Sequence, residues 1–191
     1  MEAETRPERR RERTPRRERT PRPLDAQKLD ELALAYVARF ATSAGKLATY
    51  LKRKLRERGW AGEVEPDVAA LIARLVRIGY LDDAAYGKMR GASLLRRGLG
   101  ARRIMADLSA AGLDEVAREG ARPSESGARA ALVALARKRR LGPFAATPPD
   151  RPTREKHLAV LLRAGHRLDS ARELVNLPDA GAAEDWAGGE E

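Results

Sequence analysis

Basic side chains gather in three short segments of this 191-residue chain, which carries 38 lysines and arginines against 28 acidic residues. The members of these three basic clusters are Lys52, Arg53, Lys54 and Arg56; Arg96, Arg97, Arg102 and Arg103; and Arg137, Lys138, Arg139 and Arg140. Closely spaced cations attract phosphate groups and acidic protein surfaces. Cations near a helix C-terminus can instead serve only to complement the helix dipole, and that interpretation is strongest for residues 137–140. We predict a polyanion-binding surface, with the cluster at 96–103 as its best candidate.

No set of residues in the sequence indicates catalysis or metal binding. The chain has no cysteine, so a thiolate zinc site and a thiol nucleophile are excluded. Its two histidines, His157 and His166, are isolated and are expected at repeat interfaces rather than as ligands or bases. Asp82 and Asp83 are adjacent carboxylates, for which helix capping is a simpler account than acid–base chemistry. We therefore predict a protein that is not an enzyme, with no cofactor and no metal.

Gly98 and Gly100 lie between the two arginine pairs of the second cluster. A Gly-x-Gly pair resembles half of a phosphate-binding fingerprint, but this one follows a helical pattern and not a strand. We expect the two glycines to let two helices meet at a sharp turn, and we do not expect a nucleotide site there.

Charge divides the chain into three parts. Residues 1–23 hold nine arginines and five glutamates with no aliphatic or aromatic side chain after Ala3, so we expect a disordered arginine-rich arm. Residues 178–191 hold five acids and no base, which predicts a loose acidic tail. The middle of the chain, residues 24–177, has 29 basic and 18 acidic residues, a net charge of +11. It contains no apolar run long enough to span a membrane, and we expect a cytoplasmic protein.

The spacing of apolar residues predicts the helices that carry these side chains. Apolar residues recur at intervals of three and four, the period of a helix that buries one face, and no run alternates as a strand would. The expected helices cover residues 25–40, 43–58, 66–78, 82–97, 101–111, 124–140, 153–164 and 168–176. A short helical turn is expected after Asp114, where Val116 is almost the only large apolar residue. The fold class is therefore all-α.

A pattern of leucine, three residues and glycine recurs three times, each copy 53 residues after the last. The copies begin at Leu55, Leu108 and Leu161 and end at Gly59, Gly112 and Gly165. A fixed period of this length is typical of stacked helical repeats, in which each unit buries part of its surface against its neighbour. We predict an elongated tandem array of three three-helix repeats at residues 24–80, 81–122 and 123–177, the third helix of the middle repeat being short.

These segments resemble the RecX family of bacterial regulatory proteins. The matching stretches are LALAYVARFATSAGKLATYLKRKLRERGW (32–60), GYLDD (79–83), LLRRGLGARRI (94–104), LSAAGL (108–113) and REKHLAVLLRAGH (154–166). The resemblance covers about residues 24–177. It implies tandem three-helix repeats, binding to the RecA recombinase filament on DNA, and inhibition of its ATPase, strand-exchange and coprotease activities without catalytic residues. Three features depart from the family's usual pattern: Ser43 is followed by Ala44 where arginine is common, the middle repeat's third helix is poor, and the arginine-rich arm is extra.

Two functions of different classes are compatible with the sequence. The first is a monomeric regulator of the RecA filament in DNA repair, recombination and the SOS response, which reaches single- or double-stranded DNA through the filament or binds it weakly alone. The second is a basic helical DNA- or RNA-binding module without a recombinase partner. Readers of base sequence use asparagine and glutamine, of which this chain has one each, Asn176 and Gln27, and this argues against broad sequence readout.

Overall fold

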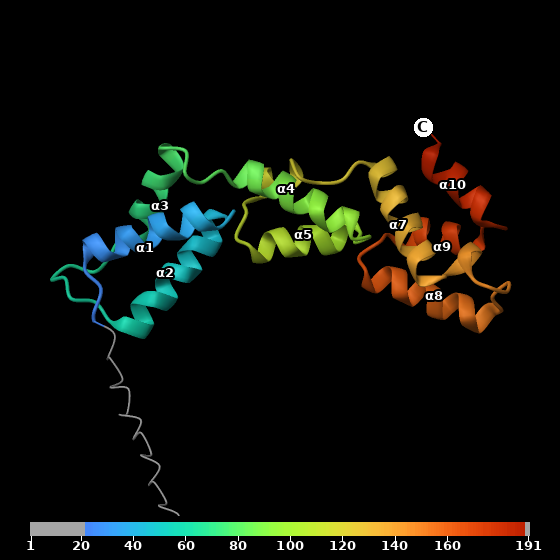
Figure 1. The fold of residues 1–191 in the computed structure, drawn as a ribbon. Helices are drawn as coiled ribbons and strands as arrows, with labels where there is room; N and C mark the ends of the chain where they lie inside the picture. Colours follow the sequence, from blue (N-terminus) through green and yellow to red (C-terminus); the bar gives the residue numbers. More distant parts are fainter. Residues whose placement is uncertain (1–21, 190–191) are drawn as a thin grey trace, which may run out of the picture.

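The computed structural model describes residues 22–189, and the arginine-rich arm expected at residues 1–23 lies outside them except for its last two residues. Within 22–189 the protein has ten α-helices, one short 3-10 helix and no β-strand (Figure 1). The all-α prediction is confirmed. None of the helices in this described part is both long and apolar enough to cross a membrane.

The first group of helices comprises α1 (Ala26–Arg39), α2 (Ala44–Arg58) and α3 (Val68–Arg77). Each begins after a residue whose side chain accepts a hydrogen bond from a backbone N–H three residues further on; these caps are Asp25, Ser43 and Asp67. Pro66, which was expected in the first turn of the third helix, instead precedes its cap. The apolar faces of the three helices enclose one cluster, whose buried members include Leu29, Ala33, Leu47, Leu51, Leu71 and Leu75.

The second group comprises α4 (Asp83–Arg96), α5 (Ala101–Ala110) and the short α6 (Glu115–Glu119). Val116 on α6 is 82% exposed, so this helix adds little apolar surface to the core. Glycines on α4 let the backbone around α6 come close instead. A Cβ on Gly87 would lie 3.2 Å from the Ala117 carbonyl oxygen, and one on Gly91 would lie 3.0 Å from that of Ala121. In this group, the close approach of the α4 backbone to the backbone around α6 thus replaces the packing of large side chains.

The third group is the largest. It comprises α7 (Glu125–Arg139), the 3-10 helix η1 (Gly142–Phe144), α8 (Arg151–Arg163), α9 (Leu168–Asn176) and α10 (Ala180–Gly188). Their buried residues form a third cluster, separate from the other two, which includes Leu132, Leu135, Ala136, Leu161, Ala171, Leu174 and Val175.

The segment expected as a loose acidic tail is a helix over residues 180–188, so that expectation is wrong for these residues. Asp179 caps α10 by accepting a hydrogen bond of 2.9 Å from the backbone N–H of Ala182. Ala183 is fully buried and Trp186 packs against the third cluster. The acidic composition predicted a tail, whereas a cap and two apolar residues three apart on one helix face were enough to dock the segment on the core.

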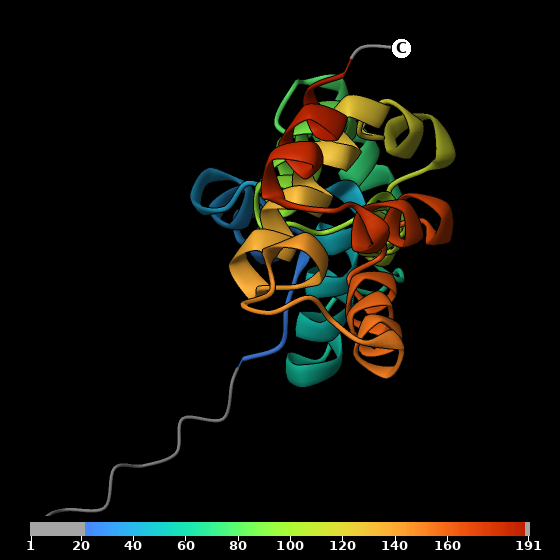
Figure 2. The same cartoon turned by 90° about the vertical axis from the view of Figure 1, so that its right-hand side faces the viewer.

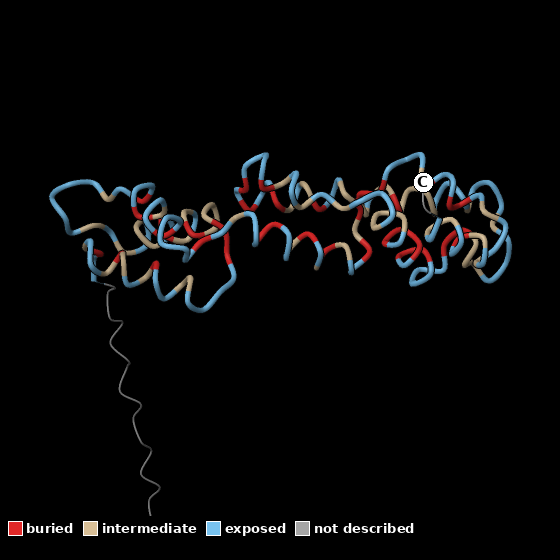
Figure 3. Tube along the Cα trace, turned by 90° about the horizontal axis from the view of Figure 1, so that it is seen from above, coloured by how far each residue is buried: buried red, intermediate tan, exposed pale blue. Residues whose placement is uncertain are grey.

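The three helix groups follow one another in a row, and the molecule is elongated (Figure 1). Viewed along the row, the groups overlap one another (Figure 2). Buried residues lie inside each group and at the two junctions between groups, while exposed residues cover the outside along the whole length (Figure 3). An elongated array of this kind exposes a long surface for its size.

The junction between the second and third groups joins the start of α5 to the end of α8. The backbone N–H of Gly100 donates to the Ala164 carbonyl at 2.9 Å, and the N–H of Arg102 donates to the Gly165 carbonyl at 3.2 Å. The backbone N–H groups at the start of α5, which have no partner within their own helix, thus bind the carbonyl groups at the end of α8, which also have none. The dipoles of α8 and α5 meet with opposite partial charges, which favours this arrangement.

The junction between the first and second groups repeats this arrangement with α2 and α5. The Ser43 hydroxyl, at the start of α2, donates to the Ala111 carbonyl at the end of α5 over 2.5 Å. The Asp83 carboxylate accepts a hydrogen bond of 2.8 Å from the Ala44 N–H. The helices α8, α5 and α2 therefore meet end to end, and we call them the α2–α5–α8 row.

The three glycines that recur at 53-residue spacing end the three helices of this row. Gly59, Gly112 and Gly165 have φ values of +77°, +79° and +94°, a region that favours glycine because other residues are strained there. At Gly112 and Gly165 the turn also brings the neighbouring group into backbone contact, since each approaches a second glycine, Gly45 or Gly100. The periodic pattern in the sequence therefore marks equivalent helix ends.

Candidate polyanion-binding surface

The first basic cluster lies on α2, at one end of the row. Lys54 forms an ion pair of 2.7 Å with Glu57, and Arg53 lies 3.6 Å from the same carboxylate. The hydrogen bond from Lys54 lowers the pKa of Glu57, so this carboxylate stays charged over a wider pH range. Lys52 and Arg56 are exposed and have no ion-pair partner in the described part of the chain. One acid thus partly neutralises four cations, and two cations remain free.

The second cluster surrounds the turn between α4 and α5, where Gly98 has φ +80° as expected for a sharp turn. Arg96 and Arg97 lie at the C-terminal end of α4, where the helix dipole favours cations. Arg102 has a structural role as well, because its guanidinium donates to the Leu162 carbonyl at the end of α8 over 2.6 Å. Capping and dipole effects therefore account in part for these three arginines.

Arg103 is different, because the first turn of a helix disfavours a cation. It lies in the first turn of α5 and is exposed. The dipole of its own helix disfavours a positive charge there, and the end of α8, which meets this turn, offsets part of that effect. Asp107, one turn further along α5, attracts Arg103 but is held in a bidentate pair by the Nε and Nη2 of Arg90, at 2.8 and 2.9 Å. Arg103 is thus the cation of the second cluster that local structure explains least.

The third cluster lies at the end of α7, which is not one of the three helices of the row. Arg137 is paired with Glu184 of α10 and stacks on the Phe144 ring at 5.4 Å. Arg140 ends the helix in the left-handed region, with φ +56°. Lys138 and Arg139 are exposed in the last turn, where they complement the helix dipole. In this position the cations complement the helix dipole, which is the simpler of the two interpretations of the sequence, and their binding to a partner stays a prediction.

The end-to-end row carries the first cluster together with Arg102 and Arg103 of the second, while Arg96 and Arg97 end the adjoining helix α4 and the third cluster ends α7. It also adds four exposed cations on α8 that sequence reasoning missed, Arg151, Arg154, Lys156 and Arg163. They lie outside the three predicted clusters, and only alignment with the repeat period could have placed them on the row. Together the three helices of the row expose Lys52, Arg53, Arg56, Arg102, Arg103, Arg151, Arg154, Lys156 and Arg163.

The carboxylate pair after Gly79 has two structural roles. Asp82 caps α4 by accepting a hydrogen bond of 2.8 Å from the Ala85 N–H, as the sequence predicted. Asp83 reaches across the junction to cap α2 instead, which could not be read from local sequence. Both carboxylates are therefore accounted for by backbone hydrogen bonds.

The two histidines lie in different surroundings. His157 accepts a hydrogen bond of 2.9 Å from the Gly142 N–H within the third group. His166 is buried at the junction, and its Nε2 lies 3.0 Å from the Gly98 carbonyl oxygen. Because a carbonyl only accepts, Nε2 carries the proton. Burial lowers the pKa of His166, since the charged imidazolium is poorly solvated there.

We expect the protein to lose stability as the pH falls through about 6.5, the ordinary pKa of histidine. Between that value and the lowered pKa of folded His166, the unfolded chain binds the proton more tightly, so protonation favours unfolding. Urea titrations at pH 7.5, 6.5 and 5.5 measure the effect. The variant His166→Gln keeps an N–H donor for the Gly98 carbonyl and should remove this pH dependence. If the variant loses stability with acid as the unaltered protein does, His166 is not its source.

These features define an elongated all-α protein of stacked helix groups that exposes cations along one row. Within residues 22–189, no cluster of side chains is able to hold a metal ion. No protein-family model matches the chain. The chain is 35% identical over 184 residues to the regulatory protein RecX of Myxococcus xanthus (strain DK1622), covering 92% of this chain and 97% of that protein. It is 30% identical over 160 residues to the regulatory protein RecX of Mycobacterium sp. (strain JLS), covering 81% and 86%. The chain belongs to the RecX family of regulatory proteins.

Solved structures agree with the fold. The crystal structure of RecX from Lactobacillus salivarius matches with a TM-score of 0.64 and 19% identity over 78% of this chain and 93% of that one. A second crystal structure of a regulatory protein RecX matches with a TM-score of 0.60 and 20% identity, over 78% and 70%. At these identities the similarity supports the all-α architecture alone.

Proposed function

We propose that this chain binds the RecA recombinase filament on DNA and lowers the ATPase, strand-exchange and coprotease activities of that filament. The observation that supports this most is the α2–α5–α8 row, which presents exposed cations at intervals along an elongated molecule. A filament on DNA repeats both its phosphates and its protein surface, so a row of separated cations can make several contacts at once. Contacts that are weak singly then act together as avidity.

The cations proposed to meet the filament are Lys52, Arg53, Arg56, Arg96, Arg97, Arg103, Lys156 and Arg163. Arg102 and Arg137 contribute less, because each is already bound to another part of the chain. The remaining residues of the predicted surface are Lys54, which is paired with an acid, and Lys138 to Arg140, which lie at the end of α7, a helix outside the row.

In this proposal, inhibition arises because the chain binds one state of the filament more tightly than another. A regulator shifts a filament between active and inactive states only to the extent that it binds one state more tightly. The end-to-end junctions hold the cations of neighbouring groups at set separations. A filament state whose anions match those separations is favoured over one whose anions do not. No catalytic step by this chain is required, and it acts as a monomer in the cytoplasm.

The proposal is tested by adding the protein to a RecA recombinase assembled on single-stranded DNA and following ATP hydrolysis. We expect hydrolysis to fall at protein amounts comparable to or below that of the recombinase, with weaker inhibition at higher salt because screening weakens the ionic contacts. Binding to the DNA alone is measured in parallel. Strong binding to bare DNA with undiminished ATP hydrolysis would instead favour a basic nucleic-acid-binding module without a recombinase partner.

A further inference from the structure

Three of the eight aromatic side chains of the protein meet at the surface of the first helix group, where α1 and α2 lie side by side (Figure 1). Tyr36 lies on α1, Phe40 directly follows that helix, and Tyr50 lies on α2. The Tyr36 and Tyr50 rings are stacked, with centroids 4.3 Å apart and planes at 25°. The Phe40 ring centroid lies 5.2 Å from that of Tyr36. We call these three residues the aromatic cluster.

The aromatic cluster is open to solvent on its outer side. Phe40 is 49% exposed, and the half-buried Tyr36 and Tyr50 pack with their inner sides against the core of the first group. Neither tyrosine hydroxyl has a hydrogen-bond partner within residues 22–189, where the only buried side-chain polar atom without a partner belongs to Thr42. Both hydroxyls therefore reach solvent. Packing on the core uses only one side of the cluster and leaves an aromatic surface available.

Three cations surround this aromatic surface. The Cζ of Arg39 lies 5.5 Å from the centre of the Phe40 ring. On α2, the Cζ of Arg53 and the Nζ of Lys54 lie 5.7 and 6.0 Å from the centre of the Tyr50 ring. A cation near the face of an aromatic ring is attracted to it, which holds these flexible side chains close to the rings. The cluster therefore combines flat rings with positive charge at its rim.

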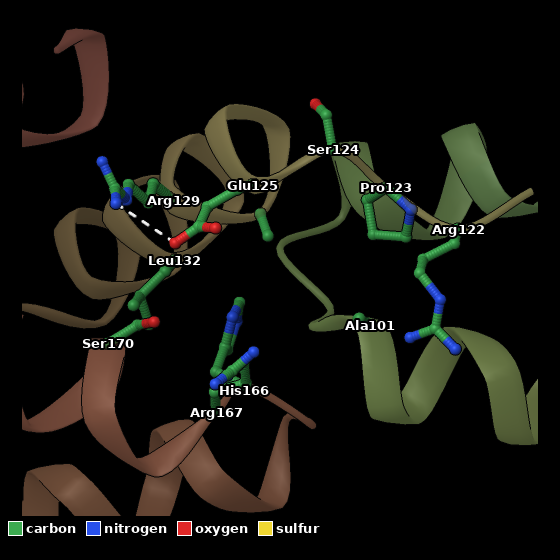
Figure 4. Close-up of a pocket in the computed structure, with 11 residues that line it drawn as sticks. Ala101, Arg122, Pro123, Ser124, Glu125, Arg129, Leu132, His166, Arg167 and Ser170 are labelled. Carbon is green, nitrogen blue, oxygen red and sulfur yellow. Dashed lines mark hydrogen bonds and ion pairs between the residues drawn. The ribbon is translucent and has the colours of Figure 1, made fainter. Parts of the chain in front are cut away.

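The positive charge at this rim is only partly neutralised. In the cavity between the second and third groups, by contrast, each lining arginine faces a carboxylate, as Arg129 faces Glu125 at 3.1 Å (Figure 4). At the aromatic cluster, one acid, Glu57, serves both cations on α2. Arg39 forms no ion pair within residues 22–189. The rim of the cluster can therefore attract an anionic partner.

The repeat period relates the aromatic cluster to the α2–α5–α8 row. Tyr50 on α2 corresponds to Arg103 on α5 and to Lys156 on α8, one and two periods later. Among residues 22–189, no aromatic rings outside the cluster are in contact with one another. The first group thus presents rings where the other two groups present cations. Cations that follow a phosphate backbone, joined to rings on which bases stack, are the combination used to bind single strands.

We infer that the aromatic cluster is a stacking site for an unpaired base of single-stranded DNA, with the neighbouring phosphates on Arg39 and Arg53. Every base has a flat π surface, so stacking needs no particular sequence. The bases of a duplex already stack on one another and are paired, so the rings cannot reach their faces. The site should therefore select single strands. The choice of DNA over RNA rests on the proposed function, whereas the site itself needs no recombinase.

The two phenylalanines make the inference measurable in the full chain without any recombinase. Phe40 belongs to the cluster, and Phe144 lies in the third group. The ring signals of protein labelled at phenylalanine are followed by nuclear magnetic resonance while a short oligothymidylate is added. We expect a saturable shift of the Phe40 signals, since a stacked base adds its ring current, and unmoved Phe144 signals. An abasic oligomer of the same length and a matching duplex should leave both sets of signals in place.

Variants of equal charge separate stacking from general attraction to a basic protein. Phe40→Leu keeps an apolar side chain but removes the ring, and we expect it to weaken binding of a dye-labelled oligothymidylate about tenfold, measured by fluorescence anisotropy. Phe40→Trp keeps a ring and should bind at least as tightly. Tyr80 is 57% exposed and lies outside the cluster, so Tyr80→Leu is the matched control and should leave the affinity within about twofold. Far-ultraviolet circular dichroism confirms that each variant keeps its helices.

Three results would overturn the inference. The first is an abasic oligomer that shifts Phe40 as the oligothymidylate does, because phosphates alone would then make the contact. The second is an equal loss of affinity in Phe40→Leu and Tyr80→Leu. The third is a Phe40→Leu variant that inhibits the recombinase ATPase less but binds the oligothymidylate unchanged, because the cluster would then contact protein. Tighter binding of the matching RNA oligomer would overturn the assignment to DNA. The binding measurements contain no recombinase, so their failure leaves the proposed function untouched.

Discussion

Replacing Gly100 by alanine is expected to lower the free energy of unfolding by about 3 kcal/mol and to uncouple the third helix group from the other two. A Cβ at this position would overlap the backbone of Gly165 and His166. Backbone atoms cannot move aside as the end of a long side chain can, so the junction must open. Opening it breaks the hydrogen bond from the Gly100 N–H to the Ala164 carbonyl.

The two tryptophans allow the uncoupling to be observed directly. Trp60 packs against the core of the first group and Trp186 against the core of the third. Fluorescence of the single-tryptophan variants Trp60→Phe and Trp186→Phe therefore reports unfolding at opposite ends of the array. In a stacked array the groups stabilise one another through their interfaces, so the two curves should nearly coincide in the otherwise unaltered chain. In the Gly100→Ala background they should separate, with the third group reporting a different midpoint.

Gly120 supplies the matched control. It has ordinary helical dihedral angles, with φ −63°, and a Cβ there would have no heavy atom closer than 3.5 Å. We expect Gly120→Ala to change stability by less than about 1 kcal/mol, with a slight gain from the lower entropy of the unfolded chain. If Gly100→Ala and Gly120→Ala behave alike, the close approach of α5 to α8 does not hold the junction together.

Gly100 also illustrates what the sequence alone could and could not predict. Helical periodicity and capping residues placed eight helices, α1 to α5 and α7 to α9, to within two residues of their observed ends. The leucine–glycine period marked the equivalent helix ends, because a glycine with positive φ and a leucine packed on the core leave a local signature. The roles of Gly45 and Gly100 have no such signature. They depend on a backbone more than 60 residues away, which becomes adjacent only after the groups have stacked.

In the candidate site, too, some features could be predicted from the sequence and others could not. The sequence showed the clusters of adjacent cations. It also indicated that residues 137–140 are weaker candidates for binding a partner than the other two clusters. Three contacts could not be predicted, because the two partners of each are distant in the sequence. In these contacts Arg102 caps α8, Asp83 caps α2, and Arg137 pairs with α10. Composition misled at residues 180–188, because two packed apolar residues outweighed an acidic net charge in deciding whether the segment is ordered.

Replacing Arg96, Arg97 and Arg103 together by glutamine is expected to raise the protein concentration needed for half-maximal inhibition of the recombinase ATPase roughly thirtyfold. Arg102 is left in place because its bond to the Leu162 carbonyl supports the junction, and its loss would confuse binding with folding. A plot of the logarithm of the binding constant against the logarithm of the salt concentration has a negative slope. Each lost phosphate contact should also make this slope less steep by about one. Inhibition curves at several chloride concentrations give both quantities.

The third basic cluster offers a control of identical charge. Replacing Lys138, Arg139 and Arg140 by glutamine removes the same three positive charges from the end of α7, outside the α2–α5–α8 row. If net charge alone attracts the protein to the filament, the two triple variants should lose inhibition equally, since long-range attraction depends on the total charge. If the cations at the start of α5 and at the adjoining end of α4 make the contacts, the control should lose less than threefold. Because both variants have the same net charge and leave the cores intact, a difference between them can arise only from where the cations lie.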